Sequence, residues 1–96
     1  IVLLLFGQRG GGDEMFMGWY DPDRKKPARE KLEEGIERYA EKFGKPPTVV
    51  LTNPEDAEAL RQPSRAYPGE PALDIREARY VARWTYYLGM ESDLAA

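Results

Sequence analysis

The chain of 96 residues is 42% hydrophobic and 32% charged, which suits one small folded domain with a single core. It has no cysteine and no histidine, and this excludes disulfides, cysteine-ligated zinc and any catalytic pair that uses histidine. The net charge of −3 argues against broad binding to nucleic acid or to anionic membranes.

The first six residues are all apolar and precede the glycine-rich stretch GQRGGGDE. The apolar run predicts a strand, and the stretch after it predicts a flexible turn or linker. The run is too short to span a membrane and lacks the basic flank and cleavage site of a signal peptide, so we expect a cytoplasmic protein without a membrane partner. Met15 and Met17 both suit a natural start. We therefore expect residues 1–14 to form a strand plus linker, with the alternative that they are an extension upstream of the natural start. We expect residues 15–96 to form a single α+β domain.

An exposed run of large apolar side chains is a template for aggregation. The run can pair with the sheet of its own domain or with a neighbouring copy. We favour the neighbouring copy, because an all-apolar strand needs cover on both faces and a domain of this size offers little. The expected partner is thus a second copy or another protein, and the expected oligomer contacts are Ile1, Val2, Leu3, Leu4, Leu5 and Phe6.

The next segment, MFMGWYDPD, is rich in aromatic residues and ends in a turn signal at Asp21-Pro22-Asp23. A helix is predicted from Pro27, which suits a first helical position, to Gly44, a natural C-terminal stop. Gly35 lies inside this helix, where it is expected to let another backbone approach closely. Spacings of three and four residues predict one apolar stripe on the helix, made of Ala28, Leu32, Ile36, Tyr39, Ala40 and Phe43.

The stretch PTVVLTNPEDAEAL predicts a strand over Thr48–Thr52 and a second helix over Pro54–Arg61. Asn53 can cap that helix, and Glu55 and Asp56 then satisfy its positive end. A bound phosphate would need the same helix end, and the carboxylates would repel it. We interpret the stretch as a structural joint between strand and helix and not as a phosphate site.

The last segment, LDIREARYVARWTYYLGM, is compatible with a helix or with strands. As a helix it has Asp74 at the N-cap and Glu77 three residues later. As strands it has a dense set of β-forming residues, which we favour, with a bend near Val81–Arg83 that makes a C-terminal hairpin. The elements together predict an α+β fold in which two helices pack on a small mixed β-sheet. The strand over residues 48–52, the second helix and a strand near Ile75 would form a βαβ-like unit.

Two stretches partly match the sequence patterns of functional sites, one of a nucleotide-binding loop and one of a metal site. The glycines of GQRGGG lack the spacing of a dinucleotide fingerprint and the lysine of a phosphate loop, so they predict a linker. Asp21 and Asp23 could ligate magnesium or manganese, but Asp-Pro-Asp is also an ordinary turn that leads into a helix. We therefore expect no catalytic residue, no cofactor and no metal.

Arginines and aromatic residues interleave near the C-terminus, and they form the candidate interaction surface: Arg76, Arg79, Arg83, Tyr80, Trp84 and Tyr86. On a sheet, such a set can stack single-stranded bases and hold phosphates. The two kinds of residue alternate along the chain and should lie on opposite faces. This favours aromatic residues in the core and arginines in ion pairs with Glu70, Glu77 and Glu91.

The segments WYDPD, EKLEEGIERYAEKFGKPPTVVLTNPED and RYVARWTYYLG resemble a class of small, uncharacterised prokaryotic proteins. These pair a YDPD turn with a helix that ends in Phe-Gly, a PTVVL-NP strand and an aromatic terminal strand. The resemblance covers most of residues 19–89. It implies this order of elements and a strand at the end, and it implies no activity.

We predict a non-catalytic protein-interaction or assembly module. The alternative is a single-stranded nucleic-acid or regulatory binder that uses the arginine and aromatic segment, and a metal-dependent phosphodiester hydrolase that uses Asp21 and Asp23 ranks third. The high charge content and the eight prolines are typical of a heat-adapted source.

Overall fold

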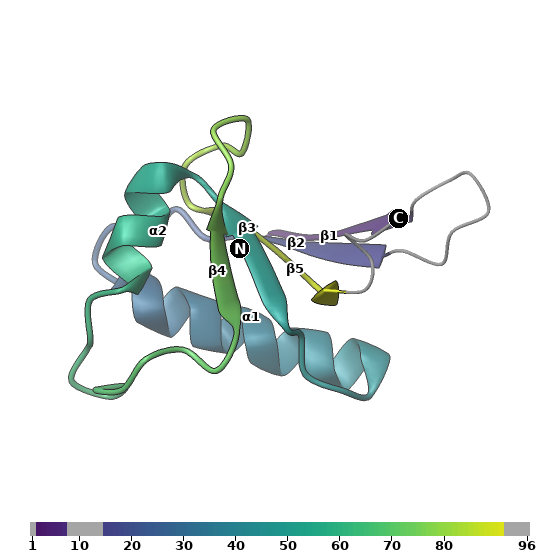
Figure 1. Ribbon diagram of the computed structural model, residues 1–96, viewed down its shortest axis with the longest axis horizontal. Helices are drawn as coiled ribbons and strands as arrows, with labels where there is room; N and C mark the ends of the chain where they lie inside the picture. The colour runs from purple at the N-terminus through teal and green to yellow at the C-terminus, as the bar shows by residue number, and fades with distance from the viewer. Residues whose placement is uncertain (1, 8–14, 92–96) are drawn as a thin grey trace.

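The computed structural model describes residues 2–7 and 15–91, with side chains described over residues 16–91. The elements in order are β1 (Val2–Gly7), β2 (Met15–Tyr20), α1 (Ala28–Phe43), β3 (Val49–Thr52), α2 (Pro54–Leu60), β4 (Asp74–Glu77) and β5 (Thr85–Gly89). The strands form one sheet in the order β1-β2-β5-β3-β4, and both helices lie on one face of it (Figure 1). The predicted α+β fold, with two helices on a mixed sheet, is confirmed.

The predicted βαβ-like unit is also confirmed. β3 and β4 pair in parallel, with Val50 opposite Ile75, and α2 connects them. The other pairings in the sheet are antiparallel, and β5 lies between β2 and β3.

The C-terminal segment forms strands, as predicted, but the predicted hairpin between them is wrong. β3 lies between β4 and β5, so the two last strands do not pair with each other. Residues 78–84 form a loop that crosses the end of β3, with a turn closed by the bond from the Val81 N–H to the Ala78 carbonyl at 3.0 Å. A hairpin was expected because the alternating pattern runs through this loop, whereas both edges of β5 are taken by β2 and β3.

Helix α1 ends as predicted, at Gly44 in the left-handed conformation with φ 78°. Its Leu32 and Tyr39 are buried in the main core with Trp19 and Leu88. Gly35 permits a close approach, although by side chains and not by another backbone. A Cβ at this position would lie 2.9 Å from Leu88 Cδ1 and 3.0 Å from Trp19 Cδ1.

The predicted Asn53 cap at the joint between β3 and α2 is confirmed. The Asn53 side chain accepts a bond from the Glu55 N–H at 2.9 Å and donates to the Val81 carbonyl at 3.1 Å. Asn53 therefore caps the helix and ties it to the loop between β4 and β5. Neither described helix is long and apolar enough to cross a membrane.

The apolar N-terminal run forms β1, which pairs antiparallel with β2 from Val2–Tyr20 to Gly7–Met15. In this structure of a single chain, the apolar run pairs with the sheet of its own domain. β1 is an edge strand of the sheet and pairs with β2 (Figure 1). Ile1 and the glycine-rich residues 8–14 lie outside the described residues. The expected pairing with a second copy stays a prediction.

Candidate functional site

Arg76 and Tyr86, the first and last residues of the candidate interaction surface, do not lie on one face of the molecule. Arg76 is in β4, where it donates to Asp74 at 2.8 Å and to Glu91 at 2.6 Å. Tyr86 is fully buried in β5, so its inclusion in an exposed surface was wrong. Its position follows from the register, which pairs it with Trp19 and Thr52 in the middle of the sheet.

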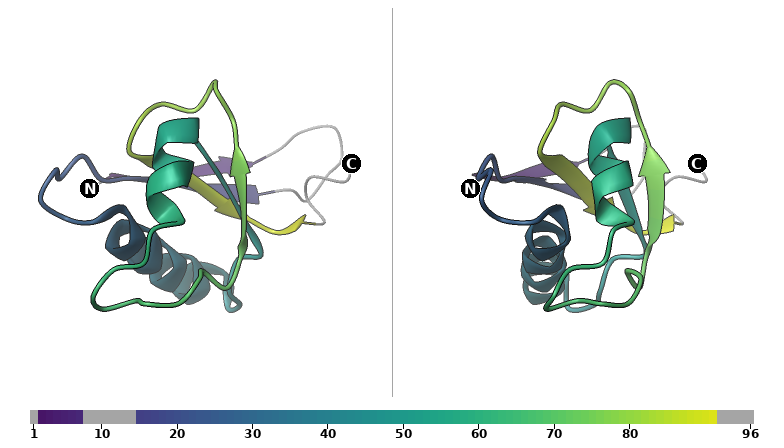
Figure 2. Two further views of the ribbon diagram at one scale, coloured as in Figure 1. Left: turned by 60° about the vertical axis from the view of Figure 1, so that its left-hand side comes forward. Right: turned by 90° about the vertical axis from the view of Figure 1, so that its left-hand side faces the viewer.

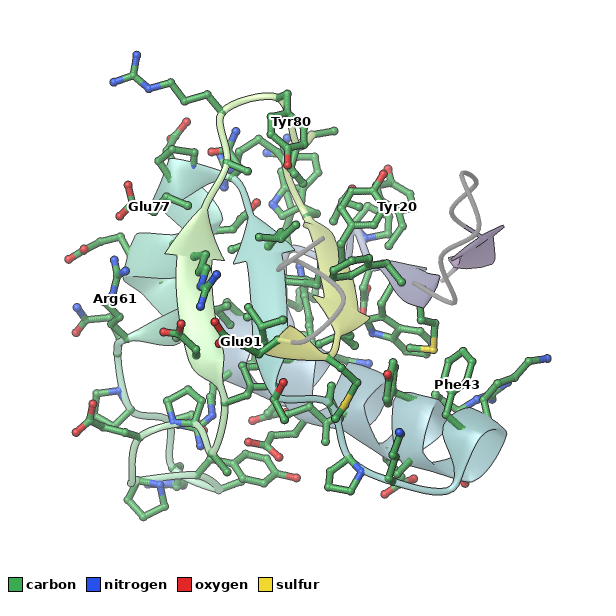
Figure 3. The ribbon with its side chains drawn as sticks, turned by 45° about the vertical axis from the view of Figure 1, so that its right-hand side comes forward. Tyr20, Phe43, Arg61, Glu77, Tyr80 and Glu91 are labelled. Atoms are coloured by element: carbon green, nitrogen blue, oxygen red, sulfur yellow. The ribbon has the colours of Figure 1, made fainter. Side chains whose placement is uncertain are left out.

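The loop between β4 and β5 carries the other four predicted residues. Arg79 and Tyr80 are exposed, Tyr80 by 82%, and Tyr80 lies at the tip of the loop (Figure 3). Arg83 and Trp84 lie closer to the body of the molecule, against the first turn of α2. Arg83 donates to Glu55 and to Asp56, each at 3.3 Å, so its charge is matched by two carboxylates.

The carboxylates considered as metal ligands take part in the turn that precedes α1. Asp21 is buried, accepts the Asp23 N–H at 3.0 Å, and has its other oxygen 3.5 Å from Lys26 Nζ. Asp23 accepts the Lys25 N–H at 2.9 Å. Within residues 2–7 and 15–91, no three histidine, cysteine, aspartate or glutamate residues group as metal ligands. The two side chains serve the ordinary Asp-Pro-Asp turn.

An open pocket of about 480 Å³ forms where three segments distant in sequence meet. These are the connection from β2 into the first turn of α1, the first turns of α2, and the end of the loop that leads into β5 (Figure 2). Its wall contains the cations Arg24, Lys26, Lys31 and Arg83, together with Asp56, Trp84 and Tyr86. We call this site the cationic pocket.

Hydrogen bonds to the backbone of Trp84 fix this residue in the wall of the cationic pocket. Its φ of 62° is uncommon for a bulky residue and is tolerated only where the surroundings fix it. The Trp84 N–H donates to Asp56 Oδ2 at 2.6 Å, and its carbonyl accepts the Asp21 N–H at 3.0 Å. The guanidinium carbons of Arg24 and Arg83 lie 5.3 and 5.2 Å from the indole centroid, within the range of cation–π attraction.

The four cations of the pocket differ in how their charges are balanced. Lys26 bonds to both oxygens of Glu34 at 3.0 Å, and this hydrogen bond raises the pKa of Lys26. Arg83 is matched by Glu55 and Asp56, as described above. Arg24 is exposed and contacts the indole, but among the described residues it has no carboxylate within ion-pair distance.

Lys31 is the unusual cation of the pocket, because it is only 3% exposed. Within the described part of the chain, its ammonium has neither a hydrogen bond nor an ion pair. Among the described residues, the enclosed side-chain atoms without a hydrogen-bond partner are Trp19 Nε1, Asp21 Oδ2 and Tyr86 Oη. Lys31 Nζ is not among them, which leaves the ammonium in contact with the pocket. A buried charge without a partner is costly to maintain, and an anion in the pocket would offset that cost.

The Tyr86 hydroxyl is enclosed beside the pocket without a hydrogen-bond partner among the described residues. Burial raises its pKa above the ordinary value of 10.0, and the carboxylates of Asp56 and Asp21 raise it further. Above about pH 10 the unfolded chain loses this proton while the folded chain keeps it, so stability falls as the pH rises.

Replacing Tyr86 with phenylalanine tests this account of the hydroxyl. At neutral pH the variant should be as stable as the parent, or more stable by about 1 kcal/mol, because the removed group is buried and unpaired. Above about pH 10 the variant should lose less stability than the parent. Urea unfolding at a series of pH values measures both effects, and a clear loss at neutral pH would show that the hydroxyl has a stabilising partner.

Sequence reasoning missed the cationic pocket and its buried lysine. The signal was present, because Ala28, Lys31 and Gly35 lie on one line of α1 at spacings of three and four. Lys31 thus belongs to the buried side of the helix. The closeness of Arg24 and Lys26 to Arg83 could not be read from the chain, which separates them by more than fifty residues.

Comparison with known proteins finds no matching family model, no matching curated protein and no matching solved structure. The resemblance to small prokaryotic proteins accordingly stays a prediction.

Proposed function

We propose that this chain is a non-catalytic binding module that takes up an anionic group of its partner in the cationic pocket. The observation that carries the proposal is Lys31, a nearly buried residue that lines the pocket and whose ammonium has no partner among the described residues. Arg24 adds a second cation to the pocket, and among the described residues it also has no carboxylate within ion-pair distance.

The carboxylate in the pocket wall supports binding over catalysis. Asp56 is almost fully buried, and its oxygens accept bonds from Arg83 and from the Trp84 N–H. A general base must be free to accept a proton from a reacting group. Asp56 instead holds the backbone of the loop that forms one side of the pocket.

Titration of the protein with small anions, followed through its backbone amide NMR signals, tests the proposal. Phosphate, sulfate and citrate form the panel, and a short oligothymidylate represents single-stranded nucleic acid. At least one small anion should cause saturable shifts centred on Lys31, Trp84 and Asp56. Lys31→Met should abolish the shifts, whereas Lys45→Met, which removes the same charge from an exposed site, should preserve them. Absence of saturable shifts with every anion would refute the proposal.

The alternative of single-stranded nucleic-acid binding through the arginine and aromatic segment has less support. Tyr86 is buried, and Arg76 and Arg83 each bond to two carboxylates. The exposed pair Arg79 and Tyr80 remains as a possible stacking element. Binding of the oligothymidylate with shifts centred on these two residues would favour this alternative.

Assembly through the β1 edge is the second candidate function, supported by the contrast between the two edge strands. The β4 edge carries Asp74, Arg76 and Glu77, and charges of this kind discourage pairing with another sheet. β1 reads VLLLFG and has neither charge nor proline. A second copy could extend the sheet along β1.

Light scattering at micromolar concentration tests assembly. We expect twice the monomer mass, and a lysine in place of Leu4 should return the monomer mass by placing a charge in the β1 edge. A lysine in place of Ala72, an exposed loop residue, is the control. A monomer at every concentration would refute this candidate.

A further inference from the structure

Resting on the proposed function, we infer that the cationic pocket binds a phosphoryl dianion, seated between the first turn of α1 and the Lys31 ammonium. The ligand class comprises inorganic phosphate and the terminal phosphate of a small phosphomonoester. Three independent observations lead to this chemistry: the open end of α1, the unpaired cations and the size of the pocket.

The N-terminus of α1 is open. Its N-cap residue, Pro27, makes no side-chain capping bond. The first bonds of the helix run from the N–H groups of Glu30 and Lys31 to the Pro27 carbonyl. The N–H groups of Ala28 and Arg29 therefore have no acceptor within residues 2–7 and 15–91. Free amides at the positive end of a sixteen-residue helix form a donor set for an anion.

The N-terminus of α2 shows what a closed helix end looks like in the same molecule. Asn53 accepts the Glu55 N–H, and two acidic residues occupy the first turn. In α1 the acidic residue of the first turn is Glu30, which does not line the pocket, while Ala28 and Lys31 do. The first turn of α2 thus carries carboxylates, whereas the first turn of α1 presents amides and an ammonium to the pocket. Asp56 of α2 also lies in the pocket wall, where it accepts bonds from Arg83 and from the Trp84 N–H.

The geometry of the donors favours phosphate over carboxylate. Ala28 and Lys31 are neighbours on one side of the first helical turn, and Arg24 also lines the pocket. A phosphoryl group offers three oxygens in tetrahedral directions and carries close to two charges at neutral pH. A carboxylate offers two oxygens in one plane and one charge. The amide of Ala28, the ammonium of Lys31 and the guanidinium of Arg24 are three donors, which match the three oxygens of a phosphoryl group better than the two of a carboxylate.

The pocket leaves room beyond one phosphate. Its volume of about 480 Å³ falls in the range of sites for small organic ligands. The phosphate of a small ester could therefore occupy the helix end while the rest of the ligand lies toward Trp84. Inorganic phosphate uses the same donors, so the source of the phosphate is decided by comparing the two ligands.

The test is a set of amide NMR titrations on the full chain with inorganic phosphate, glycerol 3-phosphate, dimethyl phosphate, sulfate and citrate. Phosphate and glycerol 3-phosphate should shift the Ala28, Arg29 and Lys31 signals with saturable curves. Dimethyl phosphate, a diester with one charge, should bind at least about tenfold more weakly. Affinity for glycerol 3-phosphate should fall about threefold or more between about pH 7.5 and about pH 5.5, because the second ionisation of a phosphate ester lies near pH 6.

Two variants locate the phosphate. Ala28→Pro removes one amide donor at a helical position that tolerates proline, and the extended conformation of Pro27 suits a residue before proline. It should lower phosphate affinity about fivefold or more, and Lys31→Met should lower it about tenfold or more. Lys45→Met should change it less than about twofold.

The outcomes separate the two proposals. Tighter binding of glycerol 3-phosphate than of inorganic phosphate assigns an ester, and the reverse order assigns free phosphate. Citrate or sulfate binding as tightly as phosphate would overturn the phosphoryl inference while the anion-binding function stands. Equal affinity for the diester would overturn the requirement for a dianion, and no effect of Ala28→Pro on a well-folded protein would overturn the placement at the helix end. No saturable binding of any anion would overturn both proposals.

Discussion

Replacing Lys31 with methionine should make the ligand-free protein more stable by about 1–2 kcal/mol. Methionine preserves the length of the apolar stem and removes an ammonium that has no partner among the described residues, from a residue that is 3% exposed. For a domain of this size, that gain raises the thermal midpoint by about 4–16 °C. Stability gained at the cost of binding is the behaviour expected of a residue kept for function.

Calorimetry with and without phosphate measures both the stability that Lys31→Met gains and the phosphate binding that it loses. The parent protein should gain stability as phosphate is added, by an amount set by the ratio of ligand concentration to dissociation constant, and the variant should gain none. Lys45→Met controls for the change in net charge. A less stable Lys31→Met protein would contradict the expectation, because it would mean that the ammonium has a favourable interaction within the folded chain.

Replacing Asp56 with alanine should destabilise the fold by about 2–4 kcal/mol. Asp56 is 2% exposed and accepts the Trp84 N–H at 2.6 Å and Arg83 Nε at 3.3 Å. Its loss leaves the Trp84 N–H without an acceptor and releases the restraint on a backbone with φ 62°. The loop that forms one side of the cationic pocket then loses its attachment to α2.

Urea unfolding measures the loss of stability, and near-UV circular dichroism reports the packing of the tryptophans. Glu55→Ala is the matched control, because Glu55 also contacts Arg83 but is exposed; it should cost less than about 1 kcal/mol. Equal effects of the two substitutions would show that the contact with the Trp84 backbone contributes little.

The local signals of the sequence predicted the helices well. Gly44 ends α1 and Asn53-Pro54 opens α2, because caps and stops act through the backbone of adjacent residues. Pro27 was predicted at the first helical position but is the extended N-cap residue, one position earlier. The strand character of the C-terminal segment followed from its β-forming residues. The hairpin was wrong because pairing depends on which strand edges are free, and β3 pairs with β4 and β5 on its two sides.

The candidate site was only partly visible in the sequence. Arg83 and Trp84 were identified from their pattern, and both line the cationic pocket. Tyr86 was included with them although it is buried, because alternation along a segment does not say where a strand begins. Lys31 was missed because a lysine in a charged helix is expected to face solvent.

The sequence by itself determined the local elements and the chemistry that this chain lacks, since both depend on residue types and on contacts between near neighbours. It excluded thiolate and histidine chemistry outright, because the chain contains neither residue. Only the tertiary structure decided the strand order and the cationic pocket. Gly35 lets Trp19 and Leu88 approach α1 closely, and the packing of α1 against α2 and β5 buries the lysine one turn earlier. The pocket exists because three distant segments meet at that point, and contacts of such long range leave no mark in the spacing of residues along the chain.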